Sequence, residues 1–268
     1  MFPDLVDIGF LHLKTYGACM AVGFLVCWRL IENLSGRKDL SNLLLSLMVS
    51  GIVGSRAAYV IEHWTEEFAS HPGRIIRVDQ GGLMFYGGLI LAIVVFFAWC
   101  AARKERALPM ADLFCAVIPL GHAFGRIGCF FYGCCYGKLS DSPLAVSFPS
   151  HSPAWFEQFH SGLIPASAAK ALPVLPTQLF EAAALLALFA ALLPLHRRAS
   201  AARAHGMVTG CYLVGYALVR FAIEFLRGDP RAAVGPLSIS QTISVCMVFL
   251  GSAFLARSWR ACHVKEEG

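Results

Sequence analysis

The chain contains few charged residues for its length. Only 15% of its 268 residues are Asp, Glu, Lys or Arg, whereas 57% are hydrophobic and the mean hydropathy is +0.62. This composition is typical of integral membrane proteins and argues against a large soluble domain. The net charge of +5 is modest, so we expect no nucleic-acid partner.

The sequence also lacks a regular cysteine framework, although it contains ten cysteines. The adjacent residues Cys134 and Cys135 do not have the C-x-x-C spacing of zinc sites, so we expect no metal and no cofactor. A disulfide between Cys129 and Cys134, a reactive thiol beside Arg126, and inert packing all remain open. Residues 1–15 have no early basic cluster, so we expect the first apolar span to stay in the mature protein.

Seven stretches are long and apolar enough to cross a bilayer, which takes about 20 residues. We therefore predict an all-α integral membrane protein with seven transmembrane helices in one domain, residues 1–268. Prolines interrupt the longest connection, so we expect a loop or small subdomain outside the membrane at 138–176. The predicted spans are 16–35, 42–61, 84–102, 110–126, 177–195, 207–226 and 237–257.

The distribution of Lys and Arg predicts the orientation of the chain. Twelve basic residues follow the first, third, fifth and seventh spans, whereas seven lie on the other side over longer segments. Because cytoplasmic loops carry the excess of Lys and Arg, we place the N-terminus outside and the C-terminus in the cytoplasm.

With this orientation, the polar residues inside the spans fall in the outer half of the bilayer. Asp112 is an exception near an inner end, where we expect it to reach water. A shared polar layer at one depth predicts one site that is open toward the outer leaflet. The residues of the layer are Tyr16, Arg56, Gly82, Tyr86, Gly87, Gly88, His122, Arg126, Gln178, Glu181, Arg220, Glu224, Ser238 and Gln241.

The balance of charges in this layer suggests that it binds an anion. Three arginines at membrane depth face two carboxylates: Arg56, Arg126 and Arg220 against Glu181 and Glu224. An unpaired charge at this depth is costly, so at least one arginine should need a further anion. A lipid phosphate would supply it, because the guanidinium fork suits phosphate oxygens.

Other interpretations of the same residues stay open. Arg220 and Glu224 are four residues apart and can form an internal ion pair on one helix face. Arg56 can pair with Glu62 or Glu181. The glycine pairs in residues 81–88 suit either a helix–helix contact or the floor of a substrate site. His122, one turn before Arg126, is either structural or a base.

Several motifs together resemble the prolipoprotein diacylglyceryl transferase family, and they cover nearly the whole chain in the family's order. They are Tyr16–Gly17, G-S-R-A-A-Y at 54–59, G-G-L-M-F-Y-G-G at 81–88, G-R-I-G at 125–128, P-T-Q-L-F-E at 176–181 and R-F-A-I-E-F-L-R at 220–227.

The resemblance implies a multi-pass enzyme of the bacterial inner membrane whose site faces the periplasm or the outer leaflet. It implies membrane lipids as surroundings, phosphatidylglycerol as donor, and as acceptor the lipobox cysteine in the signal peptide of a preprolipoprotein. The diacylglyceryl group would join that thiol as a thioether, and glycerol phosphate would leave.

The resemblance also assigns individual residues. Arg126 and Arg220 match the two essential arginines of the family, and Glu224 matches the acidic residue that follows the second. Tyr86 stands where the family has a histidine, so the predicted catalytic set includes both Tyr86 and His122. The predicted substrate-binding residues are Tyr16, Arg56, Gly87, Gly88, Cys129, Gly137, Gln178, Glu181 and Arg227.

Three further positions depart from the family pattern. Cys129 replaces an asparagine of the signature, and Tyr132 and Cys134 replace an asparagine and a glutamate. The departures lie on the presumed thiol side of the site. Two alternatives therefore remain beside the main interpretation: a phospholipid-dependent transferase with another acceptor, and a non-catalytic lipid-binding membrane protein.

Overall fold

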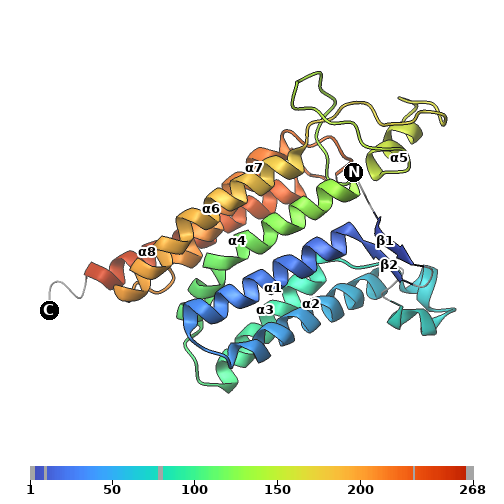
Figure 1. Cartoon of the computed structure of the whole chain (residues 1–268). Helices are drawn as coiled ribbons and strands as arrows, with labels where there is room; N and C mark the ends of the chain where they lie inside the picture. The colour runs from blue at the N-terminus through green and yellow to red at the C-terminus, as the bar shows by residue number, and fades with distance from the viewer. Residues whose placement is uncertain (1–3, 9–10, 78–80, 232, 264–268) are drawn as a thin grey trace. The chain divides into compact units, whose positions relative to one another are not determined.

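The computed structural model describes residues 4–8, 11–77, 81–231 and 233–263, and its principal elements are seven long apolar helices (Figure 1). Each is long and apolar enough to cross a membrane, which confirms the predicted all-α multi-pass fold. The helices are α1 (Thr15–Ser35), α2 (Leu40–Glu62), α3 (Phe85–Ala102), α4 (Ala107–Tyr132), α6 (Thr177–Ala201), α7 (Met207–Glu224) and α8 (Ile239–His263).

The fourth helix differs most from its predicted bounds. We expected it to end at Arg126, but α4 continues to Tyr132 and therefore includes Cys129. The glycines at 125 and 128 do not end it, because backbone groups inside a bilayer have no water to bond and are satisfied best within a helix. Arg126 thus lies nearly two turns inside α4 rather than at its end.

Two short strand pairs, which we did not predict, accompany the helices. Strands β1 (Asp4–Ile8) and β2 (Leu11–Lys14) are antiparallel, as are β3 (Ala233–Val234) and β4 (Leu237–Ser238). Strands of two to five residues are too short to show a reliable alternation in sequence.

The chain forms two compact units. The first comprises Met1–Ile31 and Ala111–Gly268, and the second comprises Glu32–Met110. In the first unit, α6, α7 and α8 pack side by side (Figure 1). The second unit is built on the pairing of α2 with α3. A single domain over residues 1–268 stays a prediction, as does the orientation of the two termini.

Glycines allow α2 and α3 to approach closely. A Cβ on Gly54 would lie 2.5 Å from the Gly87 carbonyl oxygen, and a Cβ on Gly88 would collide with the Ser55 hydroxyl. Small residues at such contacts are typical of membrane helices, where close packing replaces hydrophobic burial as the source of association. Within this unit, Gly87 and Gly88 therefore serve the close contact between α2 and α3, as the packing interpretation predicted.

Arg56 ties the segment between α2 and α3 to α2. Its guanidinium donates to four backbone carbonyl oxygens, at distances from 2.7 to 3.0 Å. The rings of Tyr59 and Phe68 lie under the same guanidinium. The acceptors belong to Arg74, Ile75, Gly81 and Gly82. Arg56 thus fixes a loop whose backbone oxygens would otherwise need other donors.

Asp112 fixes the start of α7 from its position on α4. Its carboxylate accepts from the backbone N–H groups of Gly206 (2.6 Å) and Thr209 (2.8 Å) and from the Thr209 hydroxyl (2.7 Å). The side chain is only 4% exposed, so our expectation that it reaches water was wrong. The reason is that the first N–H groups of a helix have no intrahelical partner and attract an anion.

Residues 138–176 contain both short bridges and a helix, and a separate subdomain there stays a prediction. Isolated bridges pair Val174 with Leu139 and Val146, and helix α5 (Pro153–His160) lies between Val146 and Val174 in the chain. The apolar core of this segment includes Phe148 and Trp155, both buried. The side of the membrane on which it lies stays a prediction.

The Asp112 contacts predict a large effect on stability. Replacing Asp112 with Ala removes three hydrogen bonds and leaves buried N–H groups without partners, so we expect a loss of about 1–3 kcal/mol in the free energy of unfolding. Thermal unfolding of the detergent-solubilised protein measures it. The matched control is Asp141→Ala, because Asp141 is exposed. Equal melting temperatures for the two variants would contradict the proposed anchoring of α7.

Candidate functional site

The first component of the candidate site is an ion pair between α4 and α6. The Nε atom of Arg126 lies 3.1 Å from Oε2 of Glu181. The Glu181 side chain is 1% exposed and that of Arg126 is 17% exposed. A carboxylate buried this deeply has to be paired, so Arg126 and Glu181 hold each other at one depth in the first unit.

The second component is an ion pair along one face of α7. Nη2 of Arg220 lies 2.6 Å from Oε2 of Glu224 and donates to the Ser240 hydroxyl at 2.8 Å. The structural pairing of Arg220 with Glu224 that the sequence left open is therefore present. It still leaves polar atoms unused: within the described residues, Nη1 of Arg220 and Oε1 of Glu224 are buried without a hydrogen-bond partner.

These pairs account for two of the three arginines in the charge count made from the sequence. Both Arg126 and Arg220 have a carboxylate partner within the protein. Arg56 is the third arginine of the count, and its N–H groups donate to the backbone carbonyl oxygens described above. The charges of Arg126 and Arg220 are therefore balanced within the protein, and the N–H groups of Arg56 are hydrogen bonded, so none of these arginines requires a lipid phosphate as its partner. The stronger argument for a ligand is the set of polar atoms that the two ion pairs leave without a bond.

His122 and Tyr216 lie near both arginines. Their ring centroids are 5.0 Å apart. Both Arg126 and Arg220 interact electrostatically with each of these rings, and Tyr216 is also hydrogen bonded to Arg126. Nδ1 of His122 is buried without a partner among the described residues. The structure thus brings the predicted residues Arg126, Arg220 and His122 together around a tyrosine.

Tyr216 is not among the residues predicted from the sequence, although a signal was present. Tyr216 precedes Arg220 by four residues and therefore shares its helix face. Tyrosine is common in membrane helices, so the residue type alone does not mark it out.

Tyr16 of α1 packs against α4 at Gly128. A Cβ on Gly128 would come within 3.1 Å of the Tyr16 ring, so the glycine makes room for this tyrosine. Tyr16 interacts electrostatically with Arg126 and with the thiol of Cys129. It is 40% exposed, which leaves part of its ring free to contact a ligand.

Two predicted substrate-binding residues instead bind the chain that follows α4. Gln178 is 1% exposed and donates to the carbonyl oxygen of Cys134 at 2.6 Å. Gly137 has no room for a side chain, because a Cβ there would lie 2.8 Å from the carbonyl oxygens of Leu175 and Leu226. Both residues hold this loop in place, and a role in binding substrate stays a prediction.

Arg227 forms a bidentate pair with the residue two positions later. Its Nε and Nη2 atoms donate to the two carboxylate oxygens of Asp229 at 2.7 and 2.6 Å. The arginine side chain is 2% exposed. Arg231 joins the same carboxylate at 3.2 Å. Arg227 is therefore neutralised within the protein, which leaves little of its guanidinium for a substrate.

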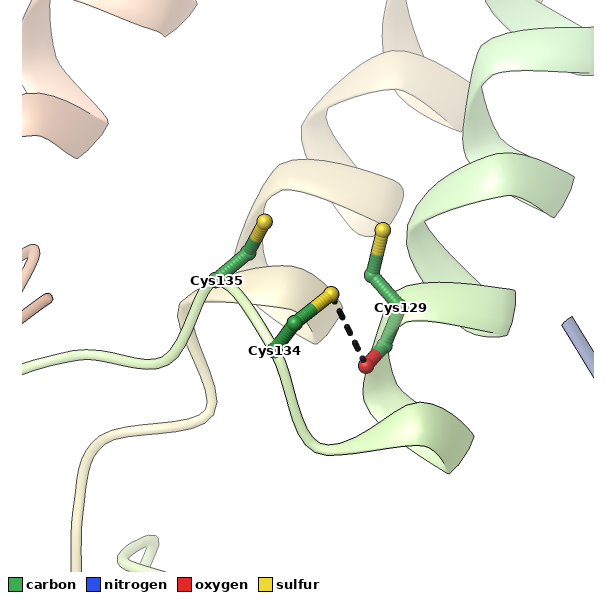
Figure 2. A group of neighbouring side chains, drawn as sticks. All are labelled: Cys129, Cys134 and Cys135. Carbon is green, nitrogen blue, oxygen red and sulfur yellow. Dashed lines mark hydrogen bonds between the residues drawn. The ribbon is translucent and has the colours of Figure 1, made fainter. Parts of the chain in front are cut away.

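Three cysteines gather at the end of α4. The Sγ atoms of Cys129, Cys134 and Cys135 all lie within 4.8 Å of one another, and all three thiols are free (Figure 2). The Cys134 thiol donates to the carbonyl oxygen of Cys129 at 3.9 Å. Hydrogen bonds from the Cys129 and Cys134 thiols lower the pKa of Cys135, with help from Arg227 and Arg126. Hydrogen bonding with Cys129 and Cys135 raises the pKa of Cys134.

The remaining predicted residues belong to the second unit. Tyr86 lies in the first turn of α3 and is 46% exposed. Arg56, Gly87 and Gly88 make the loop and helix contacts described above. Their part in the site stays a prediction.

The fold and these contacts define a multi-pass membrane protein with buried arginine–carboxylate pairs on three neighbouring helices. The profile of the prolipoprotein diacylglyceryl transferase family matches residues 3–257. The chain therefore belongs to this family, and it is a transferase of the bacterial inner membrane.

Relatives over the full length agree with the family. The phosphatidylglycerol–prolipoprotein diacylglyceryl transferase of Clostridium tetani is 31% identical over 94% of this chain and 95% of its own length. Transferase 2 of Clostridium perfringens is 31% identical over 98% of both chains. The Geobacter sulfurreducens enzyme is 29% identical over 93% of this chain and 92% of its own.

The Arg126–Glu181 pair predicts a second stability effect. Replacing Glu181 with Ala leaves the Arg126 charge uncompensated, and we expect a loss of about 3–5 kcal/mol in the free energy of unfolding. The double variant Arg126→Met/Glu181→Met removes both charges and should recover most of that loss. Thermal unfolding in detergent compares these variants with Glu66→Ala, in which an exposed glutamate is lost. A Glu181→Ala variant as stable as the Glu66→Ala control would show that the pair is not a structural requirement.

Proposed function

We propose that this protein transfers the diacylglyceryl group of phosphatidylglycerol to the lipobox cysteine in the signal peptide of a preprolipoprotein. The sulfur atom attacks the glycerol carbon, a thioether forms, the carbon–oxygen bond to phosphate breaks, and glycerol phosphate leaves with that electron pair. Family membership and the names of the full-length relatives support this activity.

The proposal rests mainly on the closeness of Arg126 and Arg220 to the same two side chains, His122 and Tyr216. The phosphodiester carries one negative charge, and the departing phosphate monoester gains a second. Fixed guanidinium groups stabilise charge that develops in this way more effectively than water does. Nη1 of Arg220, buried without a partner among the described residues, offers a donor for that phosphate.

Glu181 and Glu224 position the two arginines for this task. Each carboxylate holds one nitrogen of its guanidinium, at 3.1 and 2.6 Å respectively. An arginine held on one edge keeps the other edge aimed at a substrate without further ordering. We assign both glutamates to positioning, and the arginines to direct contact with phosphate.

His122 is the proposed proton acceptor for the acceptor thiol. A cysteine thiol is a few per cent thiolate at neutral pH and is strongly nucleophilic, so a modest base suffices. Nδ1 of His122 has no partner among the described residues. Tyr86 is the alternative base, because it stands where the resemblance places a histidine.

The proposed site faces the periplasm. The excess of Lys and Arg after alternate spans supports this orientation. The segment at 138–176 would then lie on the periplasmic side, since it connects the end of α4 that follows Arg126 with the start of α6. A secreted acceptor would reach the site from that side.

Loss of either arginine should reduce transfer strongly. For Arg126→Lys and Arg220→Lys, we expect a decrease in kcat of about 10²–10³-fold, because a donor to the developing phosphate charge is lost. The assay combines phosphatidylglycerol vesicles with a synthetic lipobox peptide and measures peptide mass and released glycerol phosphate. The control is Arg197→Ala, whose arginine is exposed near the far end of α6.

The same assay separates the alternative functions. Release of glycerol phosphate without a change in peptide mass would indicate another acceptor. Absence of release from the folded wild-type protein would indicate a non-catalytic lipid-binding protein.

The base is tested by two variants. We expect His122→Ala to lower kcat about 10²–10⁴-fold through loss of general base catalysis, and Tyr86→Phe to stay close to wild type. A rate that recovers as pH rises would link the His122 defect to proton removal, because more thiolate forms without a base. Near-wild-type rates for His122→Ala together with a loss for Tyr86→Phe would reverse the assignment.

A further inference from the structure

The turn after α4 places three thiols around one point. Cys129 belongs to the last turn of α4, whereas Cys134 and Cys135 belong to the loop that follows (Figure 2). Gly133 and Cys135 both have positive φ angles, 82° and 63°. A left-handed conformation costs a residue other than glycine roughly 1–2 kcal/mol, so the loop holds the Cys135 thiol beside the other two against a local preference.

The loop is anchored from α6. Gln178 donates to the carbonyl oxygen of Cys134 at 2.6 Å, and the Thr177 hydroxyl donates to that of Cys135 at 2.8 Å. Both anchoring side chains are 1% exposed. The thiol cluster, by which we mean Cys129, Cys134 and Cys135, is thus held by buried contacts that do not use the sulfur atoms.

The spacing of the thiol cluster suits a metal ion. Three sulfur atoms around one Zn²⁺ lie about 3.8 Å apart, given Zn–S bonds of about 2.3 Å in tetrahedral geometry. The observed separations of at most 4.8 Å need little contraction. A bond between Cys134 and Cys135 is disfavoured, because neighbouring Cα atoms are about 3.8 Å apart and disulfides usually need about 4.4 Å or more.

The surrounding charges limit the charge of the ion that the cluster can hold. Arg126 and Arg227 both interact electrostatically with Cys135. Arg126 pairs with Glu181, whereas Asp229 is shared by Arg227 and Arg231, so these side chains together carry a net charge of +1. Three thiolates with Zn²⁺ carry a net charge of −1, whereas with Cu⁺ they carry −2. The smaller buried charge is easier to accommodate.

We propose that Cys129, Cys134 and Cys135 bind one Zn²⁺ ion as three thiolate ligands, with a fourth coordination position left open. Three protein ligands and one open position are the arrangement of catalytic rather than structural zinc sites. The C-x-x-C spacing rule does not detect this set, because two of its ligands, Cys134 and Cys135, are adjacent and the third, Cys129, belongs to α4.

The open position gives the ion a role, and this step rests on the proposed function. Cys129 follows Arg126 by three residues and shares its face of α4. Zn²⁺ bound there would hold the acceptor cysteine one helical turn from the arginine that contacts the donor phosphate. The acceptor sulfur binds as a thiolate and its proton passes to His122. The sulfur then attacks the glycerol carbon as glycerol phosphate leaves.

The first experiment measures binding without any assay of transfer. The full-length protein is purified in detergent under reducing conditions, stripped with a chelator and titrated with Zn²⁺ against a chromophoric competitor. We expect one ion per chain, with a loss of affinity of at least 10-fold in Cys129→Ser, Cys134→Ser and Cys135→Ser. The control is Cys246→Ser, which changes an exposed cysteine of α8. Cd²⁺ should give sulfur-to-metal absorption of three-thiolate intensity that each of the three variants reduces.

The zinc site would be ruled out if the folded wild-type protein bound no stoichiometric ion, or bound Cu⁺ but not Zn²⁺. It would also be ruled out by unchanged Zn²⁺ affinity in the three serine variants, or by a disulfide at Cys129 in the protein as isolated. Thermal unfolding of each serine variant establishes that a loss of binding is not a loss of fold.

The second experiment tests the role of the ion in transfer. Zinc-depleted wild-type protein should modify the lipobox peptide about 10²-fold more slowly than zinc-loaded protein, and readdition of Zn²⁺ should restore the rate. Equal transfer rates for the zinc-depleted and zinc-loaded protein would show that the ion does not hold the acceptor thiol. Stoichiometric zinc binding with no transfer by either form would leave the metal site standing and reject the proposed function, so the two failures are distinguishable.

Discussion

The cost of burying charge away from water governs this protein. A membrane-spanning helix can carry an arginine only if another group compensates its charge. The protein meets this requirement in three ways: a carboxylate from a neighbouring helix for Arg126, a carboxylate on the same helix for Arg220, and backbone carbonyl oxygens for Arg56. Each solution has a different consequence for function.

An arginine that donates all its bonds to backbone carbonyl oxygens stabilises the fold. An arginine that shares only one edge with a carboxylate keeps polar atoms available for a ligand. Arg56 uses its N–H groups to hold a loop. In the two carboxylate pairs, Nη1 of Arg220 and Oε1 of both glutamates are buried without partners among the described residues. Buried polar atoms are nearly always satisfied in a stable protein, so unused atoms concentrated around His122 and Tyr216 mark the place where a polar ligand belongs.

The extent of the fold that could be predicted follows from the strength of each signal. Seven runs of about 20 apolar residues predict seven helices with little ambiguity. The ends of α4, α6 and α8 each lie six residues beyond their predicted positions, and in α4 the glycines do not act as stops inside a membrane. The two strand pairs were missed because so few residues form them. The contact of Asp112 with α7 was missed because it joins residues more than 90 positions apart.

Residue type and depth also predicted much of the candidate site. Arg126, Arg220 and His122 come together as the polar layer suggested, whereas Tyr216 was missed because tyrosine does not stand out in an apolar helix. Gly87 and Gly88 belong to a helix contact, and Gln178 and Gly137 to the loop after α4. A sequence shows that a residue is unusual for its depth, but only the contacts show whether it faces a ligand or its own backbone.

The central claim is that Arg126 and Arg220 together hold the phosphate of the lipid donor. An experimental structure of the wild-type protein with phosphatidylglycerol bound tests it most directly. The account predicts phosphate oxygens within hydrogen-bond distance of both guanidinium groups, next to His122 and Tyr216. A phosphate bound elsewhere, with both arginines contacting only Glu181 and Glu224, would contradict it.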